Sequence, residues 1–293
     1  MDWKTYLPGA YLALFFVSIG LIYWAASKRR ARRAPFKAAT KVLRQPGESL
    51  RKKIAELDDK FVDWLLLAAL GPLVVGGLFL YVAGLVAGWW ILVVLGIGAV
   101  VFALAFTWAA RWCAKKLFER ANHELGWFGE RVVGDLLAPL ERQGWRVFHD
   151  VPREGRGQTF NVDHVAIGPG GIFVIETKTR RKKAQSDEGH VVVFDGKVLT
   201  WPWGTDRSGI DQAIDNANWL QQWLKKATGE DLRVEPILTF PDWFVKEKSE
   251  SAIRVVNSSW IPGILAAKTG MLTEKQIDLA ARQLDGVCRD VEY

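Results

Sequence analysis

The stretch NVDHVAIGPGGIFVIETKT, residues 161–179, contains two apolar segments on either side of a glycine- and proline-rich turn. Residues 160–167 and 172–179 predict two antiparallel strands joined by a tight turn at 168–171. The second strand begins with a wholly apolar run, which is typical of a strand buried on both faces. The stretch therefore predicts a β-hairpin in the interior of a sheet.

Charged residues stand at one end of this hairpin. Glu176 and Lys178 are two residues apart, so they lie on the same face of the second strand. An antiparallel hairpin brings Asp163 back toward that end. Two carboxylates and an ammonium group at the edge of a buried sheet are typical of a site for a hard divalent cation and a phosphate. For a Glu-x-Lys pair alone, the simpler interpretation is a solvated strand end.

The apolar residues of the N-terminal third predict a membrane region. One transmembrane helix is predicted within residues 1–27 and a helical hairpin over 64–110, with spans near 64–86 and 89–110, giving three spans. A buried pair of core helices is the alternative, but neither span of the hairpin contains a charged residue. Tryptophans mark the predicted ends, as in an aromatic belt: Trp3, Trp24, Trp64, Trp89, Trp90, Trp108 and Trp112.

Basic residues predict the orientation of these spans. Residues 28–63 form the predicted cytoplasmic loop, and within 28–60 twelve lysines and arginines stand against four acidic residues. Such a cluster is retained in the cytoplasm, so the N-terminus is expected outside and the C-terminal domain inside a bacterial inner membrane. The net charge of +7 is then mainly a topology signal, with the lipid bilayer as partner. Cys113 and Cys288 offer neither a disulfide framework nor metal-ligand spacing.

Residues 118–241 have the alternating patterns of an α/β domain. Apolar residues at helical spacing predict a helix over 124–143, and the Asp195-Gly196 turn predicts a further hairpin. The remaining predicted elements are strands at 145–151, 234–240 and 253–256, and helices at 210–227 and 273–284, the last with a Thr-x-x-Gln capping box. This order predicts a mixed sheet flanked by helices, with 242–293 as a C-terminal extension that packs on the domain.

Four segments together resemble a known family. GERVVGDLLAPL (129–140), VFHDV (147–151), the 161–179 stretch and Asp211-Gln212-Ala213 are similar to the nuclease-related domain (NERD) family. That family resembles the PD-(D/E)xK nuclease superfamily, so the resemblance implies a restriction-endonuclease-like α/β fold. It covers roughly residues 124–240. One departure is that no proline directly precedes Asp163.

The resemblance also implies roles for individual residues. Asp163 and Glu176 resemble the metal-binding carboxylates of the family. Lys178 resembles the lysine that positions the attacking water and offsets charge on the phosphate. Glu130 resembles the helical acidic residue that orients metal-bound water, and Gln212 a residue near the same site. Without the resemblance, a surface helical glutamate is an equal interpretation of Glu130.

Phosphodiester hydrolysis independently calls for a Lewis acid and a water of lowered pKa. Hard oxygen ligands favour Mg²⁺ or Mn²⁺ over zinc. Asp163, Glu176 and the carbonyl of Thr177 are the expected ligands. Asn161 and His164 flank Asp163 and are expected to support it.

Weaker candidates for nucleic-acid binding follow the hairpin. Arg180, Arg181 and Lys182 are expected to hold phosphates, although a solvated loop is as good an interpretation. Trp201 and Trp203 are candidates for base stacking. The alternative for this pair is that it closes an edge of the core.

These features predict a membrane-anchored, metal-dependent nuclease that acts on nucleic acid in the cytoplasm, with DNA favoured over RNA. Two alternatives belong to other classes. One is a nucleic-acid-binding or sensing module that keeps the fold without turnover, and the other is a membrane scaffold that docks a partner. The sequence does not indicate the oligomeric state.

Overall fold

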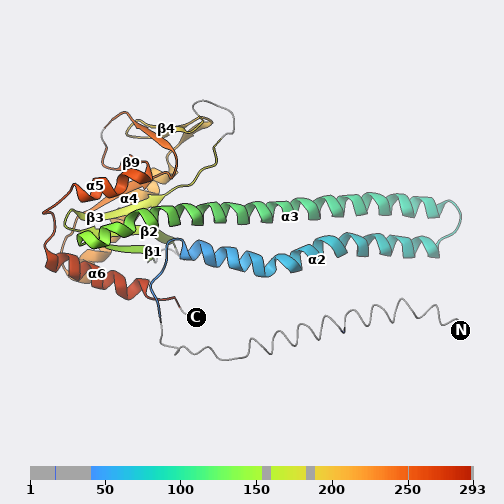
Figure 1. Ribbon diagram of the computed structural model, residues 1–293. Helices are drawn as coiled ribbons and strands as arrows, with labels where there is room; N and C mark the ends of the chain where they lie inside the picture. The colour runs from blue at the N-terminus through green and yellow to red at the C-terminus, as the bar shows by residue number, and fades with distance from the viewer. Residues whose placement is uncertain (1–16, 18–40, 154–159, 183–188, 250, 292–293) are drawn as a thin grey trace. The chain divides into compact units, whose positions relative to one another are not determined.

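The computed structural model describes residues 17, 41–153, 160–182, 189–249 and 251–291 (Figure 1). The chain divides into two compact units, residues 1–42 with 291–293 and residues 43–290. All of the helices and strands described below belong to the second unit. The first predicted span, within 1–27, and the loop as far as residue 40 lie outside the described residues, apart from the helical Val17.

Two long helices begin this unit, α2 (Glu48–Leu85) and α3 (Trp90–Leu137), and Figure 1 shows them side by side. They are 38 and 48 residues long. In the part of the chain that the structure describes, these two helices are long and apolar enough to cross a membrane. The sequence predicted three spans, of which the first lies outside the described residues. The apolar stretches of α2 and α3 are almost entirely exposed, which is compatible with membrane segments and contrary to a buried pair of core helices.

Tryptophans stand at both ends of the apolar part of this helical hairpin. Trp89 and Trp90 stack at the turn, with ring centroids 4.1 Å apart. Trp64 meets Trp112 edge to face at the other end, at 5.5 Å. At 1.5 Å per residue, residues 64–85 extend about 33 Å, close to the thickness of a bilayer's hydrocarbon core.

Both helices continue beyond their apolar stretches. Residues 48–63, predicted as part of a loop, form the first turns of α2. The predicted helix at 124–143 is the end of α3 followed by the 3₁₀ helix η2 (Ala138–Gln143). Arg120 pairs with Asp58 across the two polar segments at 2.5 Å. The reason for the difference is that charged residues at helical spacing extend a helix as readily as they form a loop.

The central sheet has five strands in the order β1-β2-β3-β7-β9. Their bounds are β1 Arg146–Arg153, β2 Phe160–Gly168, β3 Gly171–Thr177, β7 Val234–Thr239 and β9 Arg254–Val256. The first three pair antiparallel, and β3, β7 and β9 pair parallel, so the sheet is mixed, as predicted. The predicted hairpin is β2–β3, in register from His164 opposite Ile175 to Gly168 opposite Gly171. Strand β3 is buried on both faces, which confirms the interpretation of its apolar run.

A second sheet, which the sequence did not predict as separate, has the order β6-β5-β4-β8. Its strands are β4 Val191–Phe194, β5 Leu199–Trp201, β6 Gly204–Asp206 and β8 Phe244–Glu247. Strands β4 and β5 form the hairpin predicted at the Asp195-Gly196 turn. Phe194 and Leu199 of this sheet share a core cluster with Leu238 of β7 and Val255 of β9, so the second sheet packs against the central one. Strands β4, β5 and β6 pair with their neighbours in the chain, whereas β8 joins them from about fifty residues later.

Helices cover both faces of the central sheet. On one face, α4 (Ser208–Thr228) and α6 (Glu274–Cys288) pack over Val165, Ile167 and Val174. On the other, the end of α3 and the short α5 (Ile261–Ala266) pack over Ala166, Phe173 and Ile175. Helix α6 follows the predicted capping box of Thr273 and Gln276. Because alternate residues of β3 face opposite helix layers, Glu176 and Lys178 continue the face that α4 covers.

Candidate functional site

The hairpin brings Asp163 and Glu176 together at its open end. The backbone N–H of Thr177 donates to Asp163 Oδ2 at 2.7 Å, which fixes one carboxylate oxygen. Glu176 is 1% exposed. Its two oxygens accept from Lys178 Nζ at 2.8 Å and from Asn216 Nδ2 at 3.0 Å. The predicted geometry of a carboxylate on each strand is therefore present.

Lys178 links this strand to helix α4. Its Nζ also donates to Gln212 Oε1 at 2.8 Å. Gly209, one turn before Gln212, lies against the same side chain, since a Cβ there would be in ordinary contact with Lys178 Cγ at 3.4 Å. Burial lowers the pKa of Lys178, but the negative charges of Glu176 and Asp163 outweigh burial and raise it overall. Lys178 is therefore a fixed positive charge.

Glu130 enters the site from helix α3 and is buried. Its Oε2 has no hydrogen-bond partner among the described residues. Burial, followed by the charges of Asp150 and Glu176, raises the Glu130 pKa to about 8, and Lys178 partly offsets the rise. A Cβ at the preceding Gly129 would collide with the Thr179 side chain, so glycine lets this turn of α3 approach the end of β3.

Burial is also the main reason why the pKa of Asp163 lies well above its usual range, with the charges of Glu176 and Glu130 adding to it. The pKa of Glu176 is raised by burial, against the effects of Lys178 and Asn216. Three carboxylates with raised pKa values around one ammonium group have a deficit of positive charge. A cation at this place would relieve it.

The donor set fits a hard cation that keeps most of its water. Within the described residues, no set of three acidic, histidine or cysteine side chains encloses a metal ion by itself. Mg²⁺ is commonly held by one or two carboxylates with several waters, so Asp163 and Glu176 suffice. The Thr177 N–H occupies one oxygen of Asp163, and the other oxygen is available to a cation. Both oxygens of Glu176 already accept hydrogen bonds. Lys178 therefore competes with a cation for Glu176.

Asn216 is a site residue that the sequence interpretation missed. It donates to Glu176 and accepts from Arg153 Nη1 at 2.7 Å, so it links the carboxylate to strand β1. A signal was present, because an asparagine interrupts the buried stripe of α4, between Ala213 and Ala217. A buried amide in an apolar stripe is expected to have a specific partner.

We expect Asn216→Ala to weaken Mn²⁺ binding roughly 10- to 100-fold, because a residue that supports a metal ligand has effects of this size. Glu176 loses its amide donor, and its pKa should rise further. Mn²⁺ titration followed by electron paramagnetic resonance measures the affinity. Asn218→Ala is the matched control, since Asn218 is exposed on the same helix. Equal Mn²⁺ affinities in the two variants would contradict the role.

Of the predicted supporting residues, neither contacts Asp163 or Glu176 directly in the described structure. Asn161 donates to Asp150 Oδ1 at 3.1 Å. The fully buried His164 pairs with His149 through their Nδ1 atoms at 2.8 Å, and its Nε2 has no partner among the described residues. Their partners, Asp150 and His149, both belong to β1.

The basic candidates lie just beyond Lys178 and are engaged with protein groups. Arg180 pairs with Asp206 at 2.7 Å and lies over the Trp201 ring. Arg181 donates to Asn122 at 2.8 Å, and Lys182 is 3.4 Å from Asp242. All three lie at least partly exposed, so phosphate contacts would compete with weak surface pairs.

The two tryptophan candidates differ. Trp201 is 4% exposed, with its ring stacked on Trp203 and edge to face with Phe240 and Trp243, so it belongs to the core of the second sheet. Trp203 is 44% exposed and keeps surface for a base. Trp201 is therefore part of the core, in agreement with the alternative interpretation of this pair, and Trp203 is not.

A pocket of about 730 Å³ is lined by the sequence neighbours Gly129 and Thr179 of the cluster, and by none of its four charged residues. Its wall on α3 includes Phe128, Gly129 and Val132, and its opposite side includes Thr179 and Arg180, directly after Lys178. The pocket thus combines an apolar wall with a basic edge. This combination suits a group with both a flat apolar part and a negative charge, such as a nucleotide.

The raised pKa of Glu130 predicts a pH dependence of stability without metal. The folded state keeps the Glu130 proton up to about pH 8, whereas an unfolded glutamate loses it near pH 4.3. The unfolded state thus binds fewer protons, and the free energy of unfolding falls as pH rises. His149 and His164, whose pKa values burial lowers, oppose this trend only below about pH 6.5, where unfolded histidine is charged.

We therefore expect the free energy of unfolding in chelator to fall by on the order of 1 kcal/mol between pH 6.5 and 8. Tryptophan-fluorescence melting curves of the full-length protein measure this. Glu130→Gln should reduce the slope, and the raised pKa of Asp163 accounts for a slope that remains. A melting temperature that rises with pH over this window would contradict the assignment.

Comparison with known proteins gives one family. The model of the nuclease-related domain (NERD) matches residues 125–241. This match confirms the resemblance found in the sequence, and the mixed sheet flanked by helices is consistent with a nuclease-like fold. No curated protein and no solved structure matches the chain.

Proposed function

We propose that this nuclease-related domain hydrolyses phosphodiester bonds in DNA, or in RNA, with Mg²⁺ or Mn²⁺ as cofactor. The observation that carries the proposal is the meeting of Glu130, Asp163, Glu176 and Lys178, from α3, β2 and the end of β3, in one buried cluster. A structural role alone gives no reason to bury several mutually repelling carboxylates around one lysine.

Asp163 and Glu176 would hold the cation, with the Thr177 carbonyl as a further oxygen donor. When bound, Mg²⁺ or Mn²⁺ supplies Lewis acidity toward the phosphoryl oxygen and lowers the pKa of a coordinated water. Glu176 would bind the cation once the Lys178 ammonium group turns away from it toward the substrate. Its second oxygen remains fixed by Asn216.

The remaining charged residues act on the proton and on the phosphate. Glu130 has a pKa of about 8, and its Oε2 has no partner among the described residues, so from about pH 8 upward, once ionised, it is suited to accept a proton from the attacking water. Lys178 offsets the negative charge that develops on the phosphoryl group. Gln212, whose Oε1 accepts from Lys178 Nζ, would keep the ammonium group near helix α4.

The substrate would run along the basic edge that follows Lys178. Arg180 and Lys182 line the pocket and would contact backbone phosphates. Arg181 lies on the same segment. Trp203 would supply a stacking surface for a base. It directly precedes β6, the strand that contains Asp206, which pairs with Arg180.

The helical hairpin would anchor this domain in a bacterial inner membrane. Two apolar helices with tryptophans at both ends support this placement. The excess of basic residues in 28–60 favours a cytoplasmic domain, with the N-terminus outside if residues 1–27 add a third span. Extraction of the full-length protein from membranes by alkaline carbonate would contradict the anchoring.

A second candidate is a sensing module that binds nucleic acid without cleaving it. The observation in its favour is that both oxygens of Glu176 are already occupied by Lys178 and Asn216. In that case the ammonium group would neutralise the carboxylates permanently, and no cation would enter.

One experiment separates these candidates. Full-length protein in detergent is incubated with labelled single- and double-stranded DNA and RNA, in Mg²⁺, Mn²⁺ or chelator, beside Glu176→Gln prepared identically. Cleavage that requires metal and is lost in the variant supports the nuclease and identifies its substrate. Binding without cleavage would favour the sensing module. Neither binding nor cleavage would favour a membrane scaffold.

A further inference from the structure

The segment that leads into α2 packs against the candidate site. Pro46, Gly47 and Leu50 approach three residues of α3 closely. A Cβ at Gly134 would collide with the Pro46 ring, one at Gly47 would be 2.7 Å from Trp127 Cδ1, and one at Gly126 would be 3.0 Å from Leu50 Cδ1. A Cβ at Gly134 or Gly47 would require a shift, and one at Gly126 would leave little room, so the segment and the helix pack closely.

The contact covers the site's helical carboxylate. Gly126, Glu130 and Gly134 are four residues apart along α3, so they lie on one face of the helix. The segment 46–50 therefore lies over the face that carries Glu130. The backbone N–H of Gly47, which has a φ of 71°, interacts with the Glu130 carboxylate. A φ in this left-handed region favours glycine at position 47.

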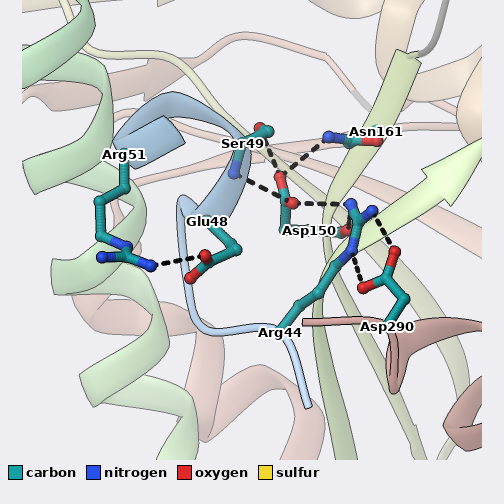
Figure 2. A network of polar contacts seen from close by, with 7 residues as sticks. All are labelled: Arg44, Glu48, Ser49, Arg51, Asp150, Asn161 and Asp290. Carbon is teal, nitrogen blue, oxygen red and sulfur yellow. Dashed lines mark hydrogen bonds and ion pairs between the residues drawn. The ribbon is translucent and has the colours of Figure 1, made fainter. Parts of the chain in front are cut away.

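Arg44 ties the same segment to the other end of the chain. Figure 2 shows its guanidinium group between two carboxylates. Nε and Nη2 donate to Asp290 at 2.7 and 2.6 Å, and Nη1 donates to Asp150 Oδ2 at 2.9 Å. Arg44 Nη1 also reaches the Asp150 carbonyl at 2.9 Å. The neighbouring Leu43 packs on the core cluster beneath α6.

Asp150 is the point where this segment meets the central sheet. It is 1% exposed and has a φ of 50°, a conformation that costs free energy in a non-glycine residue. Ser49 donates to it from both N–H, at 3.1 Å, and Oγ, at 2.6 Å, and Asn161 donates at 3.1 Å. Figure 2 shows these donors converging on one carboxylate. Arg44, Ser49 and Asn161 thus hold a strained, buried acid beside Glu130.

We propose that residues 43–50 are a positioning clamp for the site. Residues 46–50 pack over the face of α3 that carries Glu130, and Arg44 and Ser49 hold the Asp150 carboxylate. The clamp thereby joins both acids to the first turn of α2. The inference rests on the proposed function for its effect on catalysis. Under this proposal, the helical hairpin helps to position site residues in addition to anchoring the domain. None of these residues touches the substrate, so they act through Glu130 and Asp150.

Gly134→Ala in the full-length protein tests the clamp. Alanine is the stronger helix former, but its Cβ displaces Pro46, and Glu130 shifts with it. We expect kcat to fall roughly 10- to 100-fold, as small misplacements at an active site do, with KM unchanged. Gly286→Ala is the matched control, because a Cβ at this glycine of α6 meets nothing within 4 Å. Arg44→Lys should keep part of the activity that Arg44→Gln loses.

Amide hydrogen exchange gives a second readout that needs no activity. Peptides covering 43–50 and 125–137 should exchange faster in Gly134→Ala than in Gly286→Ala. Faster exchange with an unchanged kcat would overturn the positioning role, and unchanged exchange would overturn the clamp itself. If the wild type cleaves nothing, the proposed function fails, and the exchange data still decide whether the clamp exists.

Discussion

Asp163→Asn should reduce the rate of cleavage roughly 10³-fold or more. The melting temperature in chelator should stay unchanged or rise. The loss is expected because a cation ligand and its charge are removed. Asparagine can still accept from the Thr177 N–H, which donates to Asp163 at 2.7 Å. Stability is retained or gained because the raised pKa of Asp163 shows that its charge opposes folding, first through burial and then through Glu176 and Glu130.

Asp195→Asn is the control for this change. Asp195 also accepts backbone N–H groups, from Lys197 and Val198 at 2.9 Å each, and these lower its pKa. Its charge therefore favours folding. Asp195→Asn should leave cleavage unchanged and should not raise the melting temperature. A melting temperature that falls in Asp163→Asn would assign Asp163 a structural role in the hairpin, contrary to the proposal.

Lys178→Met should reduce cleavage on the order of 10³-fold, yet leave Mn²⁺ affinity unchanged or tighter. The lysine supplies charge to the phosphoryl group in the transition state, and a single preorganised donor of this kind has effects of that size. In the free protein, the ammonium group instead occupies Glu176 Oε1 at 2.8 Å and repels an incoming cation. Removal therefore separates the two functions: metal binding persists while turnover is lost.

Lys268→Met is the matched control for Lys178→Met. The two lysine side chains are similarly exposed, 28% for Lys178 and 26% for Lys268, and each pairs with one glutamate. Lys268 lies over the Phe173 ring, away from the carboxylates. Its loss should affect stability only. If Lys178→Met abolished Mn²⁺ binding, the lysine would be a structural support of the metal site, and its assigned role would be wrong.

The sequence predicted the parts of the fold that depend on local patterns. The β2–β3 hairpin, the burial of β3 and the capping box of α6 follow from alternation, turn residues and spacing over a few positions. The face shared by Glu176 and Lys178 follows from the same period of two. These features need no knowledge of distant contacts, and the structure agrees with each.

The features that were missed depend on contacts between distant segments. The second sheet arises because β8 pairs with β4, about fifty residues earlier, in parallel. The burial of Trp201 follows from Phe240 and Trp243, which no local pattern connects to it. Arg44 and Asp150 are 106 residues apart, so nothing in either local sequence indicates their pairing. Only the folded chain brings these residues together.

The most direct test of the central claim is the rate of nucleic-acid cleavage by the full-length protein as a function of Mn²⁺ concentration, at pH 8. The wild type, Asp163→Asn and Lys178→Met are compared. The account predicts a saturating rise for the wild type, saturation at the same or lower Mn²⁺ but with a far lower plateau for Lys178→Met, and no saturating rise for Asp163→Asn. Cleavage that persists in chelator, or an equal plateau in Asp163→Asn, would contradict it.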